Sequence, residues 1–283
     1  MAERLISVSI VGTGLIGASI GKALCSKKDA FFVKGFDASK ENAKTALREG
    51  AICRIANGVK DALNADAAII AIPVQFIPKF IKENSALFKK GSVVMDTGST
   101  KELVVNAMKT LPQGVEFVGG HPIAGKEKSG PESASETLFE GKKFVLTKEN
   151  RLSEKGKNIV LQVINTLNAV PVFMESARHD ELLAYTSHFP YFVSAALFAL
   201  VSEKESILPE LFEFAGSGLR DTTRIASGDP VMSYGMLETN KDNIMKALSE
   251  FEKVLKEFRT LLESGTLPEK LKAVKERRDE VWK

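Results

Sequence analysis

The chain has 283 residues, of which 44% are hydrophobic, 27% charged and 7% aromatic. This composition is typical of a soluble globular protein and excludes an intrinsically disordered chain. The 39 basic and 36 acidic residues are mixed along the sequence and leave a net charge of +3, so we expect neither a nucleic-acid-binding nor a membrane-binding face. No run approaches the ~18 apolar residues of a membrane span, and the N-terminus lacks a signal-peptide cleavage site.

The cysteine content indicates the compartment. Cys25 and Cys53 are the two cysteines of the chain, too few and too unpatterned for a disulfide framework or a zinc site. We therefore expect a reducing, cytoplasmic location and no bound metal. The length fits two domains of ordinary size.

In the first half of the chain, short β-branched runs alternate with helical stretches. Strands are predicted at 6–12, 31–37, 66–73, 92–99, 115–122 and 142–148, and the first two helices at 16–25 and 39–49. Such alternation is typical of βαβ units that form a parallel sheet with helices on both faces. We therefore predict an α/β, doubly wound Rossmann domain over residues 1–150.

From about residue 151 the spacing of apolar residues becomes helical, and we predict an all-α domain over 151–283. Its longest helix carries a narrow apolar seam, made of Ile244, Leu248, Phe251, Leu255, Phe258 and Leu262. Such a seam requires a partner helix, which favours a homodimer formed through this domain.

The stretch "IVGTGLIGASIG" has the GxGxxG spacing directly after a predicted strand and at the start of a helix. In that context Gly12 permits a tight turn, Gly14 lets the backbone approach a pyrophosphate, and Gly17 lets the helix pack on the strand. The amides of Leu15 and Ile16 then face the anion at the helix N-terminus. The alternative is a glycine turn that binds nothing.

Asp37 ends the next strand, 25 positions after Gly12. An acidic residue at this point binds the ribose hydroxyls of a dinucleotide and repels a 2′-phosphate, so NAD is favoured over NADP. Asp37 could instead be an ordinary residue at the start of a helix.

Three further strands end in the polar loops "AIPVQ", "DTGSTK" and "GGHPIAG", which contain Pro73, Ser99 and His121. Ligands bind beyond the carboxyl ends of parallel strands, so these loops are expected to meet at the nicotinamide. His121 lies in a segment too rich in glycine for an ordinary strand or helix, where an acceptor for an alcohol proton is expected. Ser99 on the adjacent loop could orient its ring. A purely structural histidine is the alternative.

The other two histidines, His179 and His188, are nine residues apart and would face opposite sides of an unbroken helix. His188 precedes Pro190, which kinks a helix and frees carbonyl groups, so it is a candidate for substrate contact. His179 is expected only to brace the start of the helix.

"GSGLRDTTRIASGDP" brings together Arg220, Asp221 and Arg224. A guanidinium there can bind a substrate carboxylate. A surface ion pair with Asp221 is the alternative, and it suits Arg220 better than Arg224.

Taken together, five ordered motifs resemble the prephenate and arogenate dehydrogenases of tyrosine biosynthesis over about residues 6 to 265. They are "GTGLIGAS", "DTGSTK", "GGHPIAGKEKSG", "HDELLAYTSHFPYFVSAAL" and "GLRDTTRIASGDP". The resemblance implies a Rossmann domain, a helical domain that forms the dimer, and an NAD-dependent oxidative decarboxylation in the cleft between them.

By this resemblance His121 matches the histidine that accepts the proton of the ring hydroxyl, and Ser99 the serine that contacts that histidine and the nicotinamide. Arg224 matches the arginine that binds a substrate carboxylate, and Asp221 a neighbour that pairs with it. Losing hydride makes the substrate a ketone vinylogous to its carboxylate, so the ring becomes aromatic as CO₂ leaves.

Two positions depart from the family pattern. Tyr191 stands in "SHFPY" where many members that use prephenate have a second histidine, and Ser233 stands where some have tryptophan. Oxidation of prephenate to 4-hydroxyphenylpyruvate is the expected reaction, with arogenate as the alternative substrate. Lys126 adds positive charge that suits the more anionic prephenate. Tyrosine is a possible inhibitor.

Two other interpretations remain open from the sequence. A β-hydroxyacid or imine dehydrogenase would share the glycine loop and the two-domain layout, but would be expected to use a lysine of the helical domain in place of His121. A non-catalytic NAD-binding sensor would be expected to have lost Ser99, His121 or Arg224.

Overall fold

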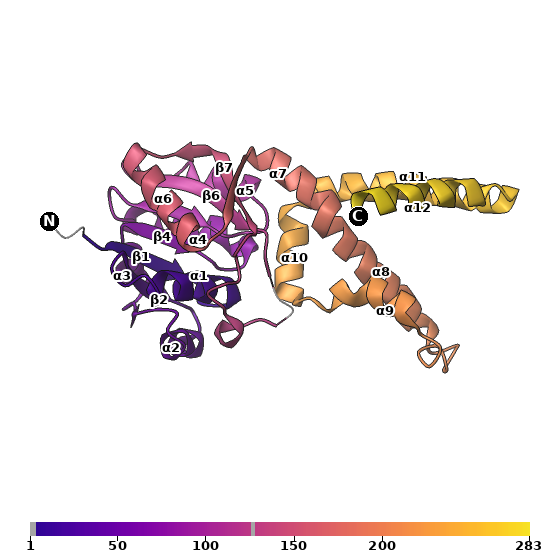
Figure 1. The fold of residues 1–283 in the computed structure, drawn as a ribbon, viewed down its shortest axis with the longest axis horizontal. Helices are drawn as coiled ribbons and strands as arrows, with labels where there is room; N and C mark the ends of the chain where they lie inside the picture. The colour runs from indigo at the N-terminus through magenta and orange to yellow at the C-terminus, as the bar shows by residue number, and fades with distance from the viewer. Residues whose placement is uncertain (1–3, 126–127) are drawn as a thin grey trace.

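The protein was analysed as a computed structural model that describes residues 4–125 and 128–283. At one end of the molecule the described strands form one sheet of eight, in the order β3-β2-β1-β4-β5-β6-β7-β8 (Figure 1). The strands are β1 Ile6–Val11, β2 Phe31–Phe36, β3 Arg54–Ile55, β4 Ala67–Ile70, β5 Val93–Asp96, β6 Glu116–Pro122, β7 Lys143–Arg151 and β8 Val170–Met174.

The first six strands are all parallel and follow the strand order of a doubly wound Rossmann sheet. This arrangement confirms the predicted fold class. The sheet is flanked by helices α1 Leu15–Cys25, α2 Lys40–Arg48, α3 Val59–Leu63, α4 Ile77–Asn84, α5 Glu102–Met108 and α6 Glu154–Thr166. Two apolar clusters form the core: one includes Ile20 of α1 and Val163 of α6, and the other Ile81 of α4 and Val104 of α5.

The end of the sheet differs from the prediction. Strand β7 is antiparallel to β6, and β8 runs parallel to β7 after the crossover helix α6. The predicted boundary at residue 150 therefore falls inside β7, since the helical spacing of α6 was taken for the start of the helical domain. The proline in "VPVFM" also obscured β8. We propose to place the boundary after Met174.

Beyond Met174 the chain is helical, as predicted (Figure 1). A helix of 29 residues, Ser176–Lys204, begins this half. It consists of α7 Ser176–Leu183, a π-helical turn at Ala184–His188, and α8 Phe189–Lys204. The others are α9 Ser217–Thr223, α10 Pro230–Thr239, α11 Lys241–Ser264 and α12 Leu267–Val281.

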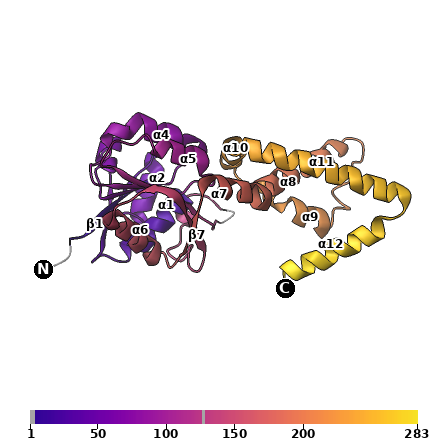
Figure 2. The same cartoon turned by 90° about the horizontal axis from the view of Figure 1, so that it is seen from above.

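The helical half forms two arms that diverge away from the sheet (Figures 1 and 2). One arm contains α8 and α9, and the other contains α11 and α12. The seam predicted on α11 lies on the second arm: Ile244 is buried near its root, whereas Leu255 and Leu262 are 53% and 68% exposed. The outer part of the seam therefore has no cover within the described part of the chain.

Helix Ser176–Lys204 corrects one expectation. It is long and apolar enough to cross a membrane by length and composition alone, and 17% of its most apolar window is buried in the single chain. The sequence survey found no such segment because polar residues such as Thr186 and Ser187 interrupt the apolar run. In the structure this helix packs at its start against the sheet half, where Ser176 bonds to the Glu149 carboxylate.

Candidate active site

The glycine loop follows β1 and leads into α1. Gly12 has a φ of +93°, and a Cβ there would lie 2.5 Å from the Ala71 carbonyl oxygen. A Cβ at Gly17 would lie 1.9 Å from the Gly12 carbonyl oxygen, so helix and loop pack directly on each other. At Gly14, by contrast, a Cβ would meet nothing within 4 Å. The loop is therefore tight where it packs on the protein and open at its middle glycine.

The N-terminus of α1 opens onto the same space. The helix begins at Leu15, followed by Ile16, and within the described residues no side chain caps it. Asp37 lies beside the loop: its Oδ2 accepts from the Thr13 amide at 2.7 Å, and its Oδ1 from the Ser39 amide at 2.8 Å. Asp37 thus links the end of β2 to the glycine loop.

His121 lies on strand β6, opposite Val145 of β7, and not in a loop as expected. The glycines before it allow close approach of neighbouring strands. A Cβ at Gly120 would lie 2.5 Å from the Asp96 carbonyl oxygen, and one at Gly119 would lie 2.8 Å from the Thr147 side chain. The strand is irregular between Val118 and Gly120. The glycine-rich sequence therefore reflects crowding in a strand at its carboxyl end.

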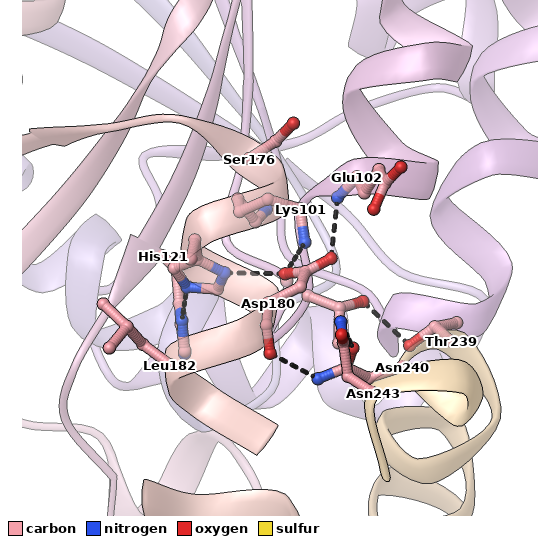
Figure 3. Close-up of polar contacts among 12 residues, drawn as sticks. Lys101, Glu102, His121, Ser176, Asp180, Leu182, Thr239, Asn240 and Asn243 are labelled. Carbon is pink, nitrogen blue, oxygen red and sulfur yellow. Dashed lines mark hydrogen bonds and ion pairs between the residues drawn. The ribbon is translucent and has the colours of Figure 1, made fainter. Parts of the chain in front are cut away.

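The ring of His121 contacts the first helix of the helical half. Its Nδ1 lies 2.8 Å from Nε2 of His179, and Nδ1 of His179 lies 2.7 Å from Oδ1 of Asp180. His179 and Asp180 are 0% and 1% exposed. The Asp180 carboxylate also accepts from the amides of Lys101 at 2.7 Å and Glu102 at 2.9 Å, which begin α5 (Figure 3). The sheet and α7 are thus joined by a continuous set of polar contacts.

A buried ion pair lies next to this cluster. Lys101 and Asp96 are both 0% exposed, and the Lys101 ammonium contacts the Asp96 carboxylate. The same carboxylate accepts from the amides of Gly98 at 2.7 Å and Gly120 at 3.0 Å. Asp96 therefore holds the "DTGSTK" loop and strand β6 together. Sequence reasoning missed both residues, although an aspartate and a lysine flanking a glycine loop after a buried strand were a usable signal.

The third histidine, His188, is connected to this cluster by Asn240, which directly precedes α11. One Asn240 side-chain amide contacts Nδ1 of His188 at 2.9 Å and donates to the Asp180 carbonyl oxygen at 2.8 Å. The sequence predicted that His179 and His188 face opposite sides of a regular helix. The π-helical turn at Ala184–His188 changes the rotation between them, and both are buried.

Burial and neighbouring charge shift the titration of this cluster. Burial, together with His179, Lys101 and His188, lowers the pKa of His121 well below its ordinary value. Burial also lowers the pKa of His188 to about 4, against the opposing effect of the Asp180 carboxylate. At neutral pH both rings are therefore neutral, and a neutral imidazole can accept a proton.

Ser99 and Pro73 lie at the ends of β5 and β4, as expected. Within the described residues Ser99 makes no hydrogen bond to His121, so the partner of that ring is His179 and not the serine that the sequence suggested. Pro73 precedes Gln75, whose side-chain amide donates to the Val231 carbonyl oxygen of α10 at 3.0 Å. This loop therefore contacts the helical half.

The remaining candidates lie on the arm of α8 and α9 or outside the described residues. Arg224 borders a hollow of about 430 Å³ next to Phe198. The ion pair that the structure gives Asp221 is with Arg220, Nε to Oδ1 at 3.6 Å, and not the expected one with Arg224. Tyr191 lies against Gly228, in van der Waals range of a Cβ built there. Lys126 lies outside the described residues.

Known proteins share both halves. Residues 20–173 match the family model described as the nucleotide-binding domain of prephenate dehydrogenase, and residues 175–276 match the dimerization domain of prephenate dehydrogenase. The two matches divide the chain at Met174, the last residue of β8.

Individual relatives cover nearly the whole chain. The prephenate dehydrogenase of Bacillus subtilis (strain 168) is 35% identical over 269 residues, which are 93% of this chain and 72% of the relative. A crystal structure of prephenate dehydrogenase from Aquifex aeolicus, in complex with hydroxyphenyl propionate and NAD+, superposes with a TM-score of 0.90 at 33% identity, covering 99% of this chain and 100% of that one. The crystal structure of Synechocystis arogenate dehydrogenase gives a TM-score of 0.81 at 26% identity, covering 98% and 100%. A Rossmann half with an open glycine loop, a histidine at the carboxyl end of β6 and a matching helical half place this chain in the prephenate dehydrogenase family.

Proposed function

We propose that the protein catalyses the NAD-dependent oxidative decarboxylation of prephenate to 4-hydroxyphenylpyruvate and CO₂. One observation carries the proposal: a histidine kept neutral by its surroundings, His121, ends strand β6 at the same edge of the sheet where the glycine loop follows β1. A proton acceptor and a dinucleotide loop at one sheet edge are what alcohol oxidation by NAD requires.

The residues of the first half fit NAD. The open space at Gly14 leaves room for a pyrophosphate next to the uncapped amides of Leu15 and Ile16. Asp37 adjoins the loop, where its carboxylate suits ribose hydroxyls and disfavours a 2′-phosphate. Pro73 and Ser99 lie in the loops that follow β4 and β5, on the side proposed for the nicotinamide. When bound, NAD supplies the hydride acceptor.

The protein residues then have three tasks. His121 takes the proton of the ring hydroxyl, so that the carbinol carbon can release hydride. Arg224 binds a carboxylate of the substrate, and Ser99, His188, Tyr191 and Asp221 complete the pocket. The ketone so formed is vinylogous to the departing carboxylate, and aromatisation of the ring drives loss of CO₂. The site therefore has to orient the substrate and remove one proton, and needs little acid catalysis.

Arogenate is a second candidate substrate because of Tyr191. This residue stands where many prephenate-using members have a histidine, and a neutral phenol does not favour a keto acid over an amino acid by charge. The product distinguishes the two activities, because prephenate yields 4-hydroxyphenylpyruvate and arogenate yields tyrosine directly. Tyrosine resembles the product of the first reaction and is the product of the second, and it is proposed as an inhibitor.

The helical half forms a homodimer in this proposal. Its match to a dimerization domain and its exposed apolar side chains support this arrangement, among them Phe214 at 86% and Leu262 at 68% exposed. The two cysteines are free, with their sulfurs 3.6 Å apart. Two neighbouring thiols fit the reducing cytoplasm, where we place the enzyme.

The test is NADH formation by the purified protein with prephenate and with arogenate, each with NAD and then with NADP. We expect turnover of prephenate with NAD, formation of a phenolic product with its own absorbance, and less activity with NADP. Activity on arogenate alone would assign the second candidate. Absence of NADH and of a phenol with both substrates would overturn the proposed function.

A further inference from the structure

All three histidines of the chain gather in one place, although they come from two different halves of the molecule. His121 is on β6, His179 is on α7, and His188 is the last residue of the π-helical turn that follows α7. The proposed reaction uses His121 and assigns His188 to the pocket wall. His179, which is 0% exposed and lies between His121 and Asp180, has no part in that scheme.

The hydrogen bonds among these side chains have a fixed direction. The Asp180 carboxylate accepts from the backbone amides of Lys101 and Glu102, and an ionised carboxylate can only accept (Figure 3). Nδ1 of His179 therefore has to donate to Asp180. In its neutral form the His179 imidazole has one N–H, which Asp180 takes up at Nδ1, so Nε2 of that form carries a lone pair and accepts from Nδ1 of His121.

The same reasoning places the last proton. Since Nδ1 of neutral His121 is the donor, Nε2 of His121 carries the lone pair. Among the described residues, the only hydrogen bond of the His121 ring is the one from Nδ1 to His179. The atom left for a substrate is thus the basic one.

We propose that His179 and Asp180 are positioning residues that hold His121 in the tautomer with its proton on Nδ1, which makes Nε2 the base of the reaction. The inference rests on the proposed function for its catalytic meaning. In the step itself the substrate O–H bond breaks, an Nε2–H bond forms on His121, and the hydride leaves for NAD. The imidazolium then donates through Nδ1 to His179, whose other nitrogen is bonded to the Asp180 carboxylate.

Other titratable groups around His121 make this positioning necessary. Lys101, His179 and His188 all act against protonation of its ring, and the Asp96 carboxylate that could favour it is paired with Lys101. Among the described residues, Asp180 is the remaining anion of the cluster, and it is connected to His121 through His179. Without that path a newly protonated His121 has no anionic partner within the described part of the chain.

The first test needs neither substrate nor cofactor. The protein has only three histidines, so a sample labelled with ¹⁵N-histidine gives three imidazole spin systems whose nitrogen shifts report the tautomer. At neutral pH we expect His121 and His179 both to carry the proton on Nδ1, with both N–H groups protected from exchange. A spectrum in which His121 carries its proton on Nε2 would overturn the proposal, whatever the activity of the protein.

The second test uses two variants of His179 and a double-mutant cycle. His179→Gln offers an amide oxygen near the position of Nε2, so it is expected to preserve the His121 tautomer and kcat within about tenfold. His179→Leu removes the acceptor and is expected to lower kcat by ~10²–10⁴, the range of a lost general base, with KM changed a few-fold.

In the His121→Asn background, His179→Leu should lower kcat less than about threefold further, because the two residues act as one unit. An equal loss in both backgrounds would mean that His179 is merely structural and would overturn the inference. If His179→Leu does not fold, the ¹⁵N spectrum of the unsubstituted protein still tests the inference, because it reports the tautomer of His121 directly. The protein could show the expected tautomers and still be inactive on both substrates. That result would refute the proposed function but would support the positioning role of His179 and Asp180.

Discussion

The two halves of the molecule bury their apolar residues very differently. The sheet half has two buried clusters, one on each face, and residues such as Val8 and Ile10 are fully shielded. Beyond Met174, the buried apolar residues among those described are Ala184, Ile244 and Ala247. The first half therefore folds around its own hydrophobic core. In the second half, most apolar side chains of the described helices are not buried by other residues of the same chain.

The exposed side chains of the helical half sharpen this contrast. Ile207, Phe214, Leu262 and Trp282 are 70%, 86%, 68% and 73% exposed. Large apolar side chains gathered on diverging arms are characteristic of a surface that another chain covers. The comparison teaches that the sheet half covers its apolar residues within one chain, whereas the helical half leaves large apolar side chains exposed among the described residues.

The largest expected effect tests which half carries the chemistry. His121→Asn removes the proposed proton acceptor on the sheet half, and we expect kcat to fall by ~10²–10⁴ with NAD affinity unchanged. Steady-state NADH formation and NAD titration by fluorescence measure the two quantities. A variant with the rate of the parent protein would contradict the role of His121.

The next effect concerns completion of the helical half by a second chain. Leu255→Glu places a charge in the exposed part of the α11 seam, and we expect dimer affinity to fall about 100-fold, or about 3 kcal/mol. Lys253→Glu is the matched control, since at 100° per residue it lies on the far side of α11. Sedimentation equilibrium measures both. Equal behaviour of the two variants would show that the seam is not at the interface.

The third prediction concerns the pH dependence of stability, through the buried His188 at the junction between the two halves. His188 has a pKa of about 4 in the folded protein and an ordinary value near 6.5 when unfolded, so the unfolded state binds more protons between these values. The contribution of His188 to stability should therefore be full above pH 6.5 and fall by about 3 kcal/mol as the pH drops to 4. Urea unfolding at pH 7, 5.5 and 4 measures this loss. In His188→Asn the loss should be smaller by that amount, and an unchanged profile would exclude His188 as its source.

Arg224 tests whether the helical half binds the substrate while the sheet half binds the cofactor. Arg224→Ala removes a charge-assisted contact to a carboxylate, and we expect the substrate KM to rise about 10- to 100-fold with little change in the NAD KM. Initial rates with each component varied in turn separate the two constants. Equal increases in both would argue against a carboxylate contact.

The smallest effect separates packing from binding within the glycine loop. Gly17→Ala inserts a methyl group 1.9 Å from the Gly12 carbonyl oxygen and should destabilise the fold by about 1–3 kcal/mol. In Gly14→Ala the added methyl group has no atom within 4 Å, so this variant should have the thermal stability of the parent protein but a lower affinity for NAD. Thermal unfolding and NAD titration of the pair measure both effects. Loss of stability in Gly14→Ala would assign that glycine to packing.

Local patterns in the sequence predicted most of the sheet half. Strand β1, helix α1 and strand β2 lie within a residue of the expected ranges because each is determined by short-range periodicity and by the glycines between them. The antiparallel β7 and the added β8 were not predictable in this way. Their placement depends on pairing between distant strands, which no local spacing records.

The candidate site shows the same limit. His121 was found because a histidine among glycines after a strand is unusual. His179 was expected only to brace its helix, since its role depends on a contact with a residue 58 positions earlier in the chain. Asp96 and Lys101 were missed because burial of an ion pair is a property of packing.

His121 sits on a paired strand, opposite Val145, and a side chain on such a strand keeps one direction. The base of the proposed reaction is therefore a fixed reference point in the molecule, and it does not move with a flexible loop. Substrates with different side chains have to be accommodated from the helical side. Change of substrate preference during evolution can then proceed by substitutions on the arms, such as the tyrosine at position 191, without re-aiming the group that takes the proton.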